Sequence, residues 1–323
     1  MRKFIVKCVC FGLLVVSLAF ALDYMISKGL HKTECYRYQT FNDIFKGNLD
    51  YDVLYMGNSR CFSHFNPRII DSVCHVNSYG LGMGACPINV QIAVYHAYKA
   101  HNGIPKTIVQ QVDFMTLQLK NDIRHQHDSQ RFFPTVYDRV MRKELKKLGY
   151  GFMELCCPLY RYNGDQKVIK DGLLECLGIR HYVERPAYKG FSPEKGRWDG
   201  TNLASMDSIV ADMDRGAMDM FENYLEECKQ DGVYVVLVNS PVYSQTTAKV
   251  KNMDELNDYY ENTARRFGYG YLNYTENYPL CDDTCNFCVS IHMNAEATDR
   301  FSCDFAKDLL SITQEKDAYQ VYD

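Results

Sequence analysis

The chain has 323 residues, a net charge of −4 and a pI near 6.1. This length is sufficient for one large α/β domain with insertions. The slightly acidic balance argues against a nucleic-acid-binding protein, which usually carries a basic face. The sequence also has no low-complexity tract and no repeat at a solenoid period.

The N-terminus combines a basic flank, Met1–Lys7, with an uncharged stretch, Cys8–Leu22. Apolar character then resumes, so the span Phe4–Ile26 approaches the roughly 20 residues that cross a bilayer. We therefore expect an uncleaved signal anchor within residues 1–30, with the rest of the chain facing the periplasm or the cell exterior. The alternative is a removed signal peptide, because Ala19–Ala21 is compatible with a small-residue cleavage site.

The elements that follow alternate between strands and helices. Residues 31–48 are polar with scattered aromatics, which predicts a linker or an edge element after the anchor. Strands are predicted at 52–56, 74–79, 107–113, 232–239 and 269–272, and the main helices at 88–100, 207–230, 253–267 and 294–312. This alternation predicts an α/β fold with a doubly wound, flavodoxin-like parallel sheet of about five strands.

The rhythm breaks between residues 114 and 205, which are rich in Arg, Tyr, Phe, His, Gly and Pro. We interpret this segment as a mostly helical or irregular insertion on the carboxyl side of the sheet, such as a lid or substrate platform. The α/β domain is then expected at 49–315 and a C-terminal tail at 316–323. His125, His127 and Asp128 have a spacing compatible with a metal site, but three loop residues are more often solvated, so no metal is expected.

The number of cysteines is compatible with an exported protein. Cys8 and Cys10 fall inside the apolar segment, and the other twelve of the fourteen lie in the exported part, where disulfides can form. The C-x3-C-x2-C spacing of Cys281, Cys285 and Cys288 is shared with the cluster-binding loop of radical S-adenosylmethionine enzymes. Because this cluster follows an export signal and lies near the chain end, we expect at most one disulfide and no iron–sulfur cluster.

Two segments carry the chemistry. Tyr51–Arg60 reads as a short apolar strand that runs into a Gly-Asn-Ser turn, which would present the Ser59 hydroxyl at the carboxyl end of a strand. Ser290–Asn294 offers His292 ahead of the last helix. A serine and an imidazole brought together are the minimum for an activated nucleophile. The alternative is that Ser59 only caps the helix after it.

With these motifs in this order, and a glycine-rich loop after the second strand, the chain resembles the SGNH/GDSL hydrolase superfamily. It looks closest to the membrane-anchored branch that includes the alginate O-acetylation proteins and the D-alanyl transfer protein of teichoic acid synthesis. The resemblance covers most of 50–113 and 232–312. It implies Ser59 as nucleophile, His292 as base and the Gly82 N–H as oxyanion donor, with Gly80 and Gly84 as rivals. Plain turn glycines, or a weak dinucleotide fingerprint, are the other interpretations of this loop.

Two features of the family are missing. The asparagine expected after the third strand is replaced at Val112-Asp113, and Asn239 is a loose substitute. The aspartate three residues before the histidine is replaced by Val289, which leaves Asp282 and Asp283 as candidates for the orienting acid. The family pattern therefore supplies a serine and a histidine but not a complete triad.

The expected function is that of a bacterial, membrane-anchored, extracytoplasmic esterase or O-acyltransferase. It would act on envelope or secreted glycans through Ser59 and His292 without a metal or organic cofactor. The expected partners are an acylated or acyl-accepting glycan and the membrane, and no nucleic acid. Two alternatives are a non-catalytic glycan-binding or assembly protein with the same fold, and a redox enzyme built on the cysteine cluster.

Overall fold

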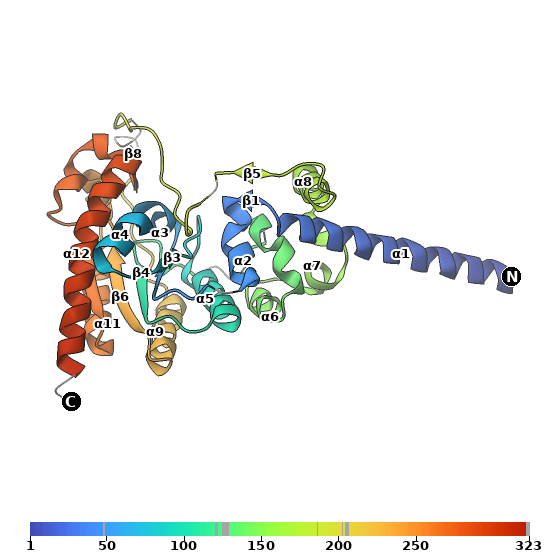
Figure 1. Cartoon of the computed structure of the whole chain (residues 1–323), viewed down its shortest axis with the longest axis horizontal. Coiled ribbons are helices and arrows are strands. Elements are labelled where there is room, and N and C mark those ends of the chain that lie inside the picture. The colour runs from blue at the N-terminus through green and yellow to red at the C-terminus, as the bar shows by residue number, and fades with distance from the viewer. Residues whose placement is uncertain are drawn as a thin grey trace. The chain divides into compact units, whose positions relative to one another are not determined.

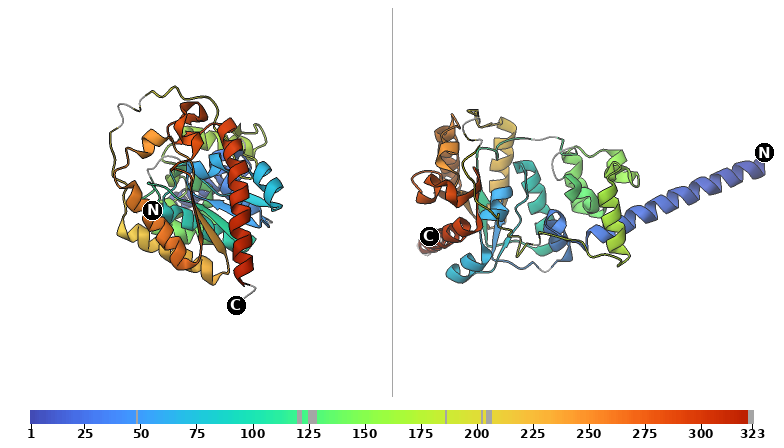
Figure 2. Two further views of the ribbon diagram at one scale, coloured as in Figure 1. Left: turned by 90° about the vertical axis from the view of Figure 1, so that its left-hand side faces the viewer. Right: turned by 90° about the horizontal axis from the view of Figure 1, so that it is seen from above.

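The structure is a computed structural model that describes residues 1–47, 49–119, 122–124, 129–185, 187–201, 203 and 207–320. It divides into two compact units, which we describe separately (Figures 1 and 2). Unit 1 consists of Met1–Lys46 and Asn121–Pro186, and unit 2 of Gly47–Lys120 and Ala187–Asp323. The chain therefore leaves unit 1, builds the first part of unit 2, returns to unit 1 and then completes unit 2.

Unit 2 is built on a parallel five-stranded sheet with the order β3-β2-β4-β6-β7. The strands are β2 (Val53–Met56), β3 (Ser78–Gly80), β4 (Thr107–Gln111), β6 (Tyr234–Asn239) and β7 (Gly270–Asn273). Numbered along the chain within this sheet, the order is 2-1-3-4-5, the flavodoxin-like arrangement. The predicted parallel α/β sheet is confirmed, and every residue of β6 is buried, as its apolar run indicates.

Helices cover both faces of this sheet. Helices α4 and α12 pack on each other, and α9 packs on both α5 and α11. The left view in Figure 2 shows α12 on one side of the sheet and α9 on the other. The helices of unit 2 are α3 (Ser59–His64), α4 (Pro67–Cys74), α5 (Ile88–Asn102), α9 (Arg215–Gln230), α10 (Ser244–Thr247), α11 (Met253–Phe267) and α12 (Ala295–Gln320). Two 3-10 turns, η3 (Pro279–Asp282) and η4 (Thr284–Asn286), lead into an antiparallel hairpin of β8 (Phe287–Val289) and β9 (His292–Met293).

Unit 1 is mainly helical. It contains α1 (Arg2–Leu30), α2 (Tyr36–Lys46), α6 (Arg139–Lys147), α7 (Phe152–Cys156) and α8 (Gln166–Cys176). Two 3-10 segments, η1 (Ser129–Tyr137) and η2 (Tyr160–Tyr162), and a short parallel pair, β1 (Glu34–Cys35) with β5 (Val183–Glu184), complete it.

The domain boundaries differ from those predicted in two places. Residues 31–48 are expected to be a linker, but β1 and α2 occupy most of them. The reason is that Tyr38, Phe41 and Ile44 recur every third residue and bury one face of α2. The predicted insertion at 114–205 is also divided. Its middle part belongs to unit 1, whereas Ser192 and Trp198 donate backbone hydrogen bonds to Phe62 and Phe287 of unit 2.

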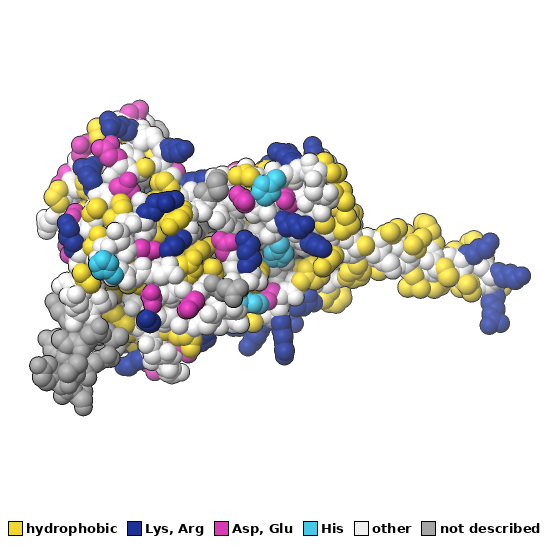
Figure 3. Space-filling model, viewed as in Figure 1, with side chains coloured by type: hydrophobic (Ala, Val, Ile, Leu, Met, Phe, Trp, Pro, Cys, Tyr) yellow, Lys and Arg dark blue, Asp and Glu magenta, His cyan; other side chains and the backbone are white. Residues whose placement is uncertain are grey.

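Helix α1 is long and apolar enough to cross a membrane, and it is the one such helix in the described part of the chain. Figure 3 shows hydrophobic side chains along its projecting part and Lys and Arg at its tip. Burial begins at Asp23 and continues with Ile26, Ser27, Gly29 and Leu30. The last turns of α1 pack against α8, where a Cβ on Gly29 would lie 1.7 Å from the carbonyl oxygen of Gly172. A signal sequence near an N-terminus would have the same length and composition.

Candidate active site

Ser59 stands at the first residue of α3, directly after strand β2. The turn between them requires Gly57, because its φ is +154° and a Cβ there would lie 2.7 Å from Gln111 Oε1. Asn58 caps the helix by accepting a hydrogen bond from the Arg60 N–H at 3.1 Å. Because β2 is an inner strand between β3 and β4, Ser59 lies at the carboxyl edge of the sheet, where α/β folds bind ligands.

His292 reaches this edge from the hairpin that precedes α12. It is the first residue of β9 and pairs across the hairpin with Val289. Its Nε2 lies 2.8 Å from the Ser59 Oγ, and both side chains are half-buried. The distance is within the reach of a nucleophile and its general base. The structure thus brings together the two predicted residues that are 233 positions apart.

A second histidine, His64 at the end of α3, holds the hairpin that carries His292. Its Nε2 accepts the Met293 N–H at 3.1 Å, so the ring proton is on Nδ1, which lies 3.0 Å from Ser240 Oγ. Burial lowers the pKa of His64 well below its ordinary value, and the nearby His292 and Arg60 lower it further. His64 is therefore a neutral ring that joins α3 to β9. No sequence motif singles out His64, and its position five residues after Ser59 is the one signal that points to it.

Both neighbours of Ser59 bind the same carboxylate. Arg60 Nη2 lies 2.6 Å from Asp113 Oδ2 with both side chains 3% exposed, and Asn58 Nδ2 donates to the same oxygen. Burial alone would raise the pKa of Asp113, but the Arg60 charge and the donated hydrogen bonds hold this pKa below its ordinary value. Asp113 is therefore an ionised acceptor where the family has an amide donor, and it fixes the turn on either side of Ser59.

Gly82 follows β3 and lies against the first turn of α3. A Cβ on it would be 2.7 Å from both Cys61 Cβ and the Phe62 nitrogen, so only glycine fits. Its backbone N–H interacts with the sulfur of Cys61, a thiol whose pKa is raised by burial. Gly80 donates its N–H to the Lys189 carbonyl at 2.9 Å. Gly82 thus lies beside the turn that carries Ser59, and its oxyanion role stays a prediction.

The remaining acid and amide candidates lie elsewhere. Asn239 is buried at the end of β6 and donates to Asn257 Oδ1 at 3.3 Å. Asp282 and Asp283 are both exposed, and Asp283 accepts the Cys285 N–H at 2.8 Å. Among the contacts of the described residues, none joins either carboxylate to His292. An orienting role for Asp282 or Asp283 stays a prediction.

The cysteines of the C-x3-C-x2-C cluster do not converge. Cys281 is buried with its thiol on the Tyr274 carbonyl, Cys285 is exposed, and Cys288 donates to the His292 carbonyl at 3.4 Å. None of the fourteen cysteines forms a disulfide bond. Within the described ranges, no group of three or more His, Cys, Asp or Glu side chains is placed to hold a metal ion. His125, His127 and Asp128 lie outside the described residues.

No protein-family model matches the chain, and no curated protein matches it. The resemblance to SGNH hydrolases therefore rests on the short sequence motifs, and membership of that superfamily stays a prediction.

Proposed function

We propose that this protein is a membrane-anchored serine esterase or O-acyltransferase of the SGNH type, acting on envelope or secreted glycans. The observation that carries the proposal is the 2.8 Å contact between Ser59 Oγ and His292 Nε2. Its position at the carboxyl edge of a parallel sheet adds support, because ligands of such folds bind there.

In this mechanism Ser59 Oγ attacks the ester carbonyl while His292 Nε2 removes the hydroxyl proton. The oxyanion of the tetrahedral intermediate would be stabilised by backbone N–H groups. The Ser59 N–H is suited to this because the first residues of a helix have no partner within the helix, and the Gly82 N–H would turn to the oxyanion from the Cys61 sulfur. His292 then returns the proton to the leaving alcohol, and water or an acceptor hydroxyl repeats the sequence in reverse to release the acyl group.

The anchor would be α1, with the rest of the chain outside the cytoplasm. Burial begins at Asp23, just after the Ala19–Ala21 sequence, so cleavage there would leave the buried contacts of unit 1 intact. The mass of the mature protein distinguishes the two forms: an uncleaved chain retains Met1, whereas a removed signal peptide leaves a chain beginning at Leu22.

The test is covalent labelling with a fluorophosphonate probe, together with hydrolysis of 4-nitrophenyl acetate. The full-length protein should be labelled, and Ser59→Ala should abolish both signals. His292→Ala should lower the hydrolysis rate by about 10²–10⁴-fold, the contribution of a positioned general base. Ser311→Ala, on the exposed side of α12, and His75→Asn, at an exposed left-handed position, are matched controls that should behave as the wild type.

Two observations favour the second candidate, a non-catalytic glycan-binding or assembly protein. The Gly82 N–H interacts with a thiol, and Asp113 is an acceptor where the family has a donor. A folded wild-type protein that no probe labels and that hydrolyses no aryl ester would favour this candidate over the enzyme.

A further inference from the structure

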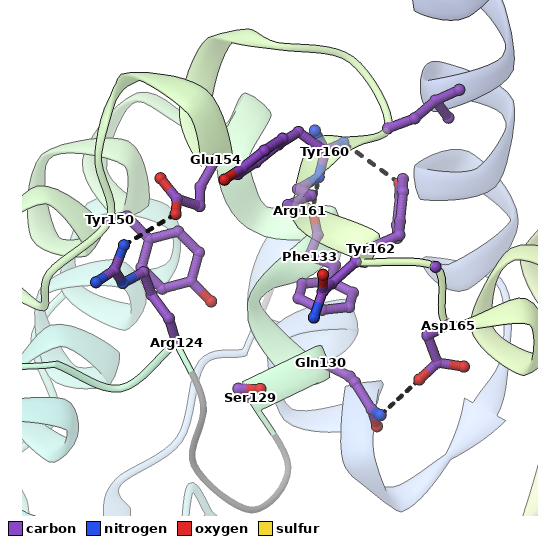
Figure 4. A pocket seen from close by; sticks show the side chains of 13 residues that line it. Arg124, Ser129, Gln130, Phe133, Tyr150, Glu154, Tyr160, Arg161, Tyr162 and Asp165 are labelled. Atoms are coloured by element: carbon purple, nitrogen blue, oxygen red, sulfur yellow. Dashed lines mark hydrogen bonds and ion pairs between the residues drawn. The ribbon is translucent and has the colours of Figure 1, made fainter.

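Unit 1 contains a cavity of about 780 Å³ that is separate from the Ser59–His292 pair. Its walls come from η1, η2 and the ends of α7 and α8 (Figure 4). Four aromatic rings line it: Phe133, Tyr150, Tyr160 and Tyr162. Its volume lies within the range of pockets that hold small organic ligands, and aromatic walls with a few fixed polar groups are typical of such pockets.

One buried polar group in this cavity has no partner in the described part of the chain. The Tyr150 hydroxyl makes no hydrogen bond although the side chain is only 4% exposed. Figure 4 shows it directed into the space between Arg124 and Phe133. Burial raises the pKa of this phenol, which keeps it neutral. A buried hydroxyl without a partner is unfavourable, so a ligand that supplied a partner would remove this penalty.

The charges around the cavity are balanced. Arg124 Nη1 lies 3.0 Å from Glu154 Oε1, and Arg161 Nη2 lies 2.5 Å from Asp23 Oδ2. Asp165 accepts a hydrogen bond from Gln130 Nε2 at 2.7 Å. Because each arginine already has a carboxylate partner, the cavity does not favour a phosphate or carboxylate ligand. Aromatic faces with neutral donors and acceptors instead suit a polyhydroxylated, uncharged ligand.

The cavity is also joined to the inner end of α1. Asp23 is the first buried residue after the exposed apolar stretch of this helix. Besides binding Arg161, it accepts the Leu159 N–H at 2.8 Å and so holds a leucine with a φ of +65° in the cavity wall. An anchor formed by α1 therefore places this cavity next to the surface of the bilayer.

We propose that the cavity of unit 1 is a binding site for a neutral glycan at the membrane surface. Binding at this site does not depend on the chemistry of Ser59, so this proposal is tested independently of the proposed enzyme activity. Tyr150 supplies a hydrogen bond that is made only when the glycan is bound, and the ring of Tyr160, which is 50% exposed, packs on the apolar face of a sugar.

The experiment uses the full-length protein in lipid nanodiscs and isothermal titration with neutral tetrasaccharides of glucose, N-acetylglucosamine and mannose. At least one should bind, and Tyr150→Phe should weaken this binding by about threefold to tenfold, the effect of one hydrogen bond. Tyr224→Phe, an equally conservative change at a buried tyrosine of unit 2, should leave the affinity unchanged. Ser59→Ala should also bind as the wild type. No binding of any tetrasaccharide, or an equal loss in both tyrosine variants, would overturn the proposal.

Three further measurements sharpen the result. Tyr150→Phe removes an unpaired hydroxyl, so without ligand the amide hydrogens of unit 1 should exchange at the same rate as in the wild type or more slowly. Faster exchange together with an unaltered affinity would show that Tyr150 has a structural role and would overturn the assignment. Tetragalacturonate should bind at least tenfold more weakly than the neutral sugars, and tighter binding would contradict the charge argument.

Adding diglucosyldiacylglycerol to the nanodiscs shows whether the glycan ligand is a lipid headgroup or a free sugar. If it is a lipid headgroup, the glycolipid competes and lowers the apparent affinity for the free sugar. If it is a free glycan, this affinity is unchanged.

Discussion

Unit 1 and unit 2 both contain a buried arginine–aspartate pair, and the surroundings of the two pairs differ. Arg60 and Asp113 in unit 2 follow neighbouring parallel strands, and their contact fixes the turn that carries Ser59. Arg161 and Asp23 in unit 1 join the 3-10 segment η2 to the C-terminal part of α1. Replacing such a pair with apolar residues is often neutral, but removing one partner leaves a buried charge uncompensated. One pair therefore holds the turn that carries Ser59, and the other holds the C-terminal part of α1.

The largest expected effect comes from breaking the pair in unit 2. Asp113→Ala should destabilise this unit by about 3–5 kcal/mol, because the Arg60 guanidinium is left buried and unpaired. Trp198, the single tryptophan, belongs to unit 2 and packs on Tyr243, so its fluorescence during urea unfolding reports this loss. Labelling of Ser59 by the fluorophosphonate should also fall. An unchanged urea midpoint would show that the pair does not anchor the turn.

Breaking the pair in unit 1 should cause a loss of stability of similar size, but in unit 1 instead of unit 2. Asp23→Ala leaves Arg161 uncompensated and removes the acceptor of the Leu159 N–H, so we expect a loss of about 3–5 kcal/mol confined to unit 1. Hydrogen exchange should rise in peptides from 129–176, while the Trp198 transition and the labelling of Ser59 stay unchanged. Lys46→Ala, which breaks a pair with Asp43 in which the lysine side chain is 69% exposed, is the control and should cost less than about 1 kcal/mol. A loss of Ser59 labelling in Asp23→Ala would contradict this separation.

The same contrast explains which parts of the fold the sequence predicts. The strands of unit 2 are evident because their apolar runs, above all Tyr234–Asn239, have one local interpretation. After the apolar stretch of α1, unit 1 has no comparable run. The pattern of residues 36–46 does not indicate a helix, because the buried face of α2 consists of spaced apolar residues among polar ones. The association of 121–186 with the N-terminus depends on contacts such as Gly29 on Gly172, which no local pattern encodes.

Within the candidate site, Ser59 and His292 could be named because each lies in a short motif at the edge of a predicted element. The roles of Asp113 and His64 could not, because they depend on which strands and loops become neighbours. Asp113 was regarded as a missing asparagine, yet the structure makes it the shared acceptor of Asn58 and Arg60. Short motifs thus predict Ser59 and His292, which come into contact, better than the residues that hold them in place.

A smaller effect is expected where α1 crosses α8. Gly29→Ala would place a Cβ 1.7 Å from the Gly172 carbonyl oxygen, so the two helices must separate at a cost of about 1–3 kcal/mol. Gly12→Ala is the matched control on the same helix, because no atom lies within 4 Å of its added Cβ. Limited proteolysis of unit 1 should be faster for Gly29→Ala and unchanged for Gly12→Ala. Equal rates for the two variants would show that the helix crossing does not hold α1 in place.

The smallest expected effect is on how stability depends on pH, measured for unit 2 through Trp198. Burial lowers the pKa of His64 in unit 2 well below its ordinary value and also lowers the pKa of His31 in unit 1. A histidine with a lowered folded pKa binds its proton more readily in the unfolded chain, so stability is complete above pH 6.5 and is lost as the pH falls below it. For His64 this loss has a slope of up to about 1.4 kcal/mol per pH unit. His64→Gln should reduce the slope between pH 6.5 and 5.5 in urea unfolding followed by Trp198 fluorescence, whereas His75→Asn, at an exposed position, and His31→Gln should leave it unchanged. An equal slope in His64→Gln would show that the ring is not held neutral between Ser240 and Met293.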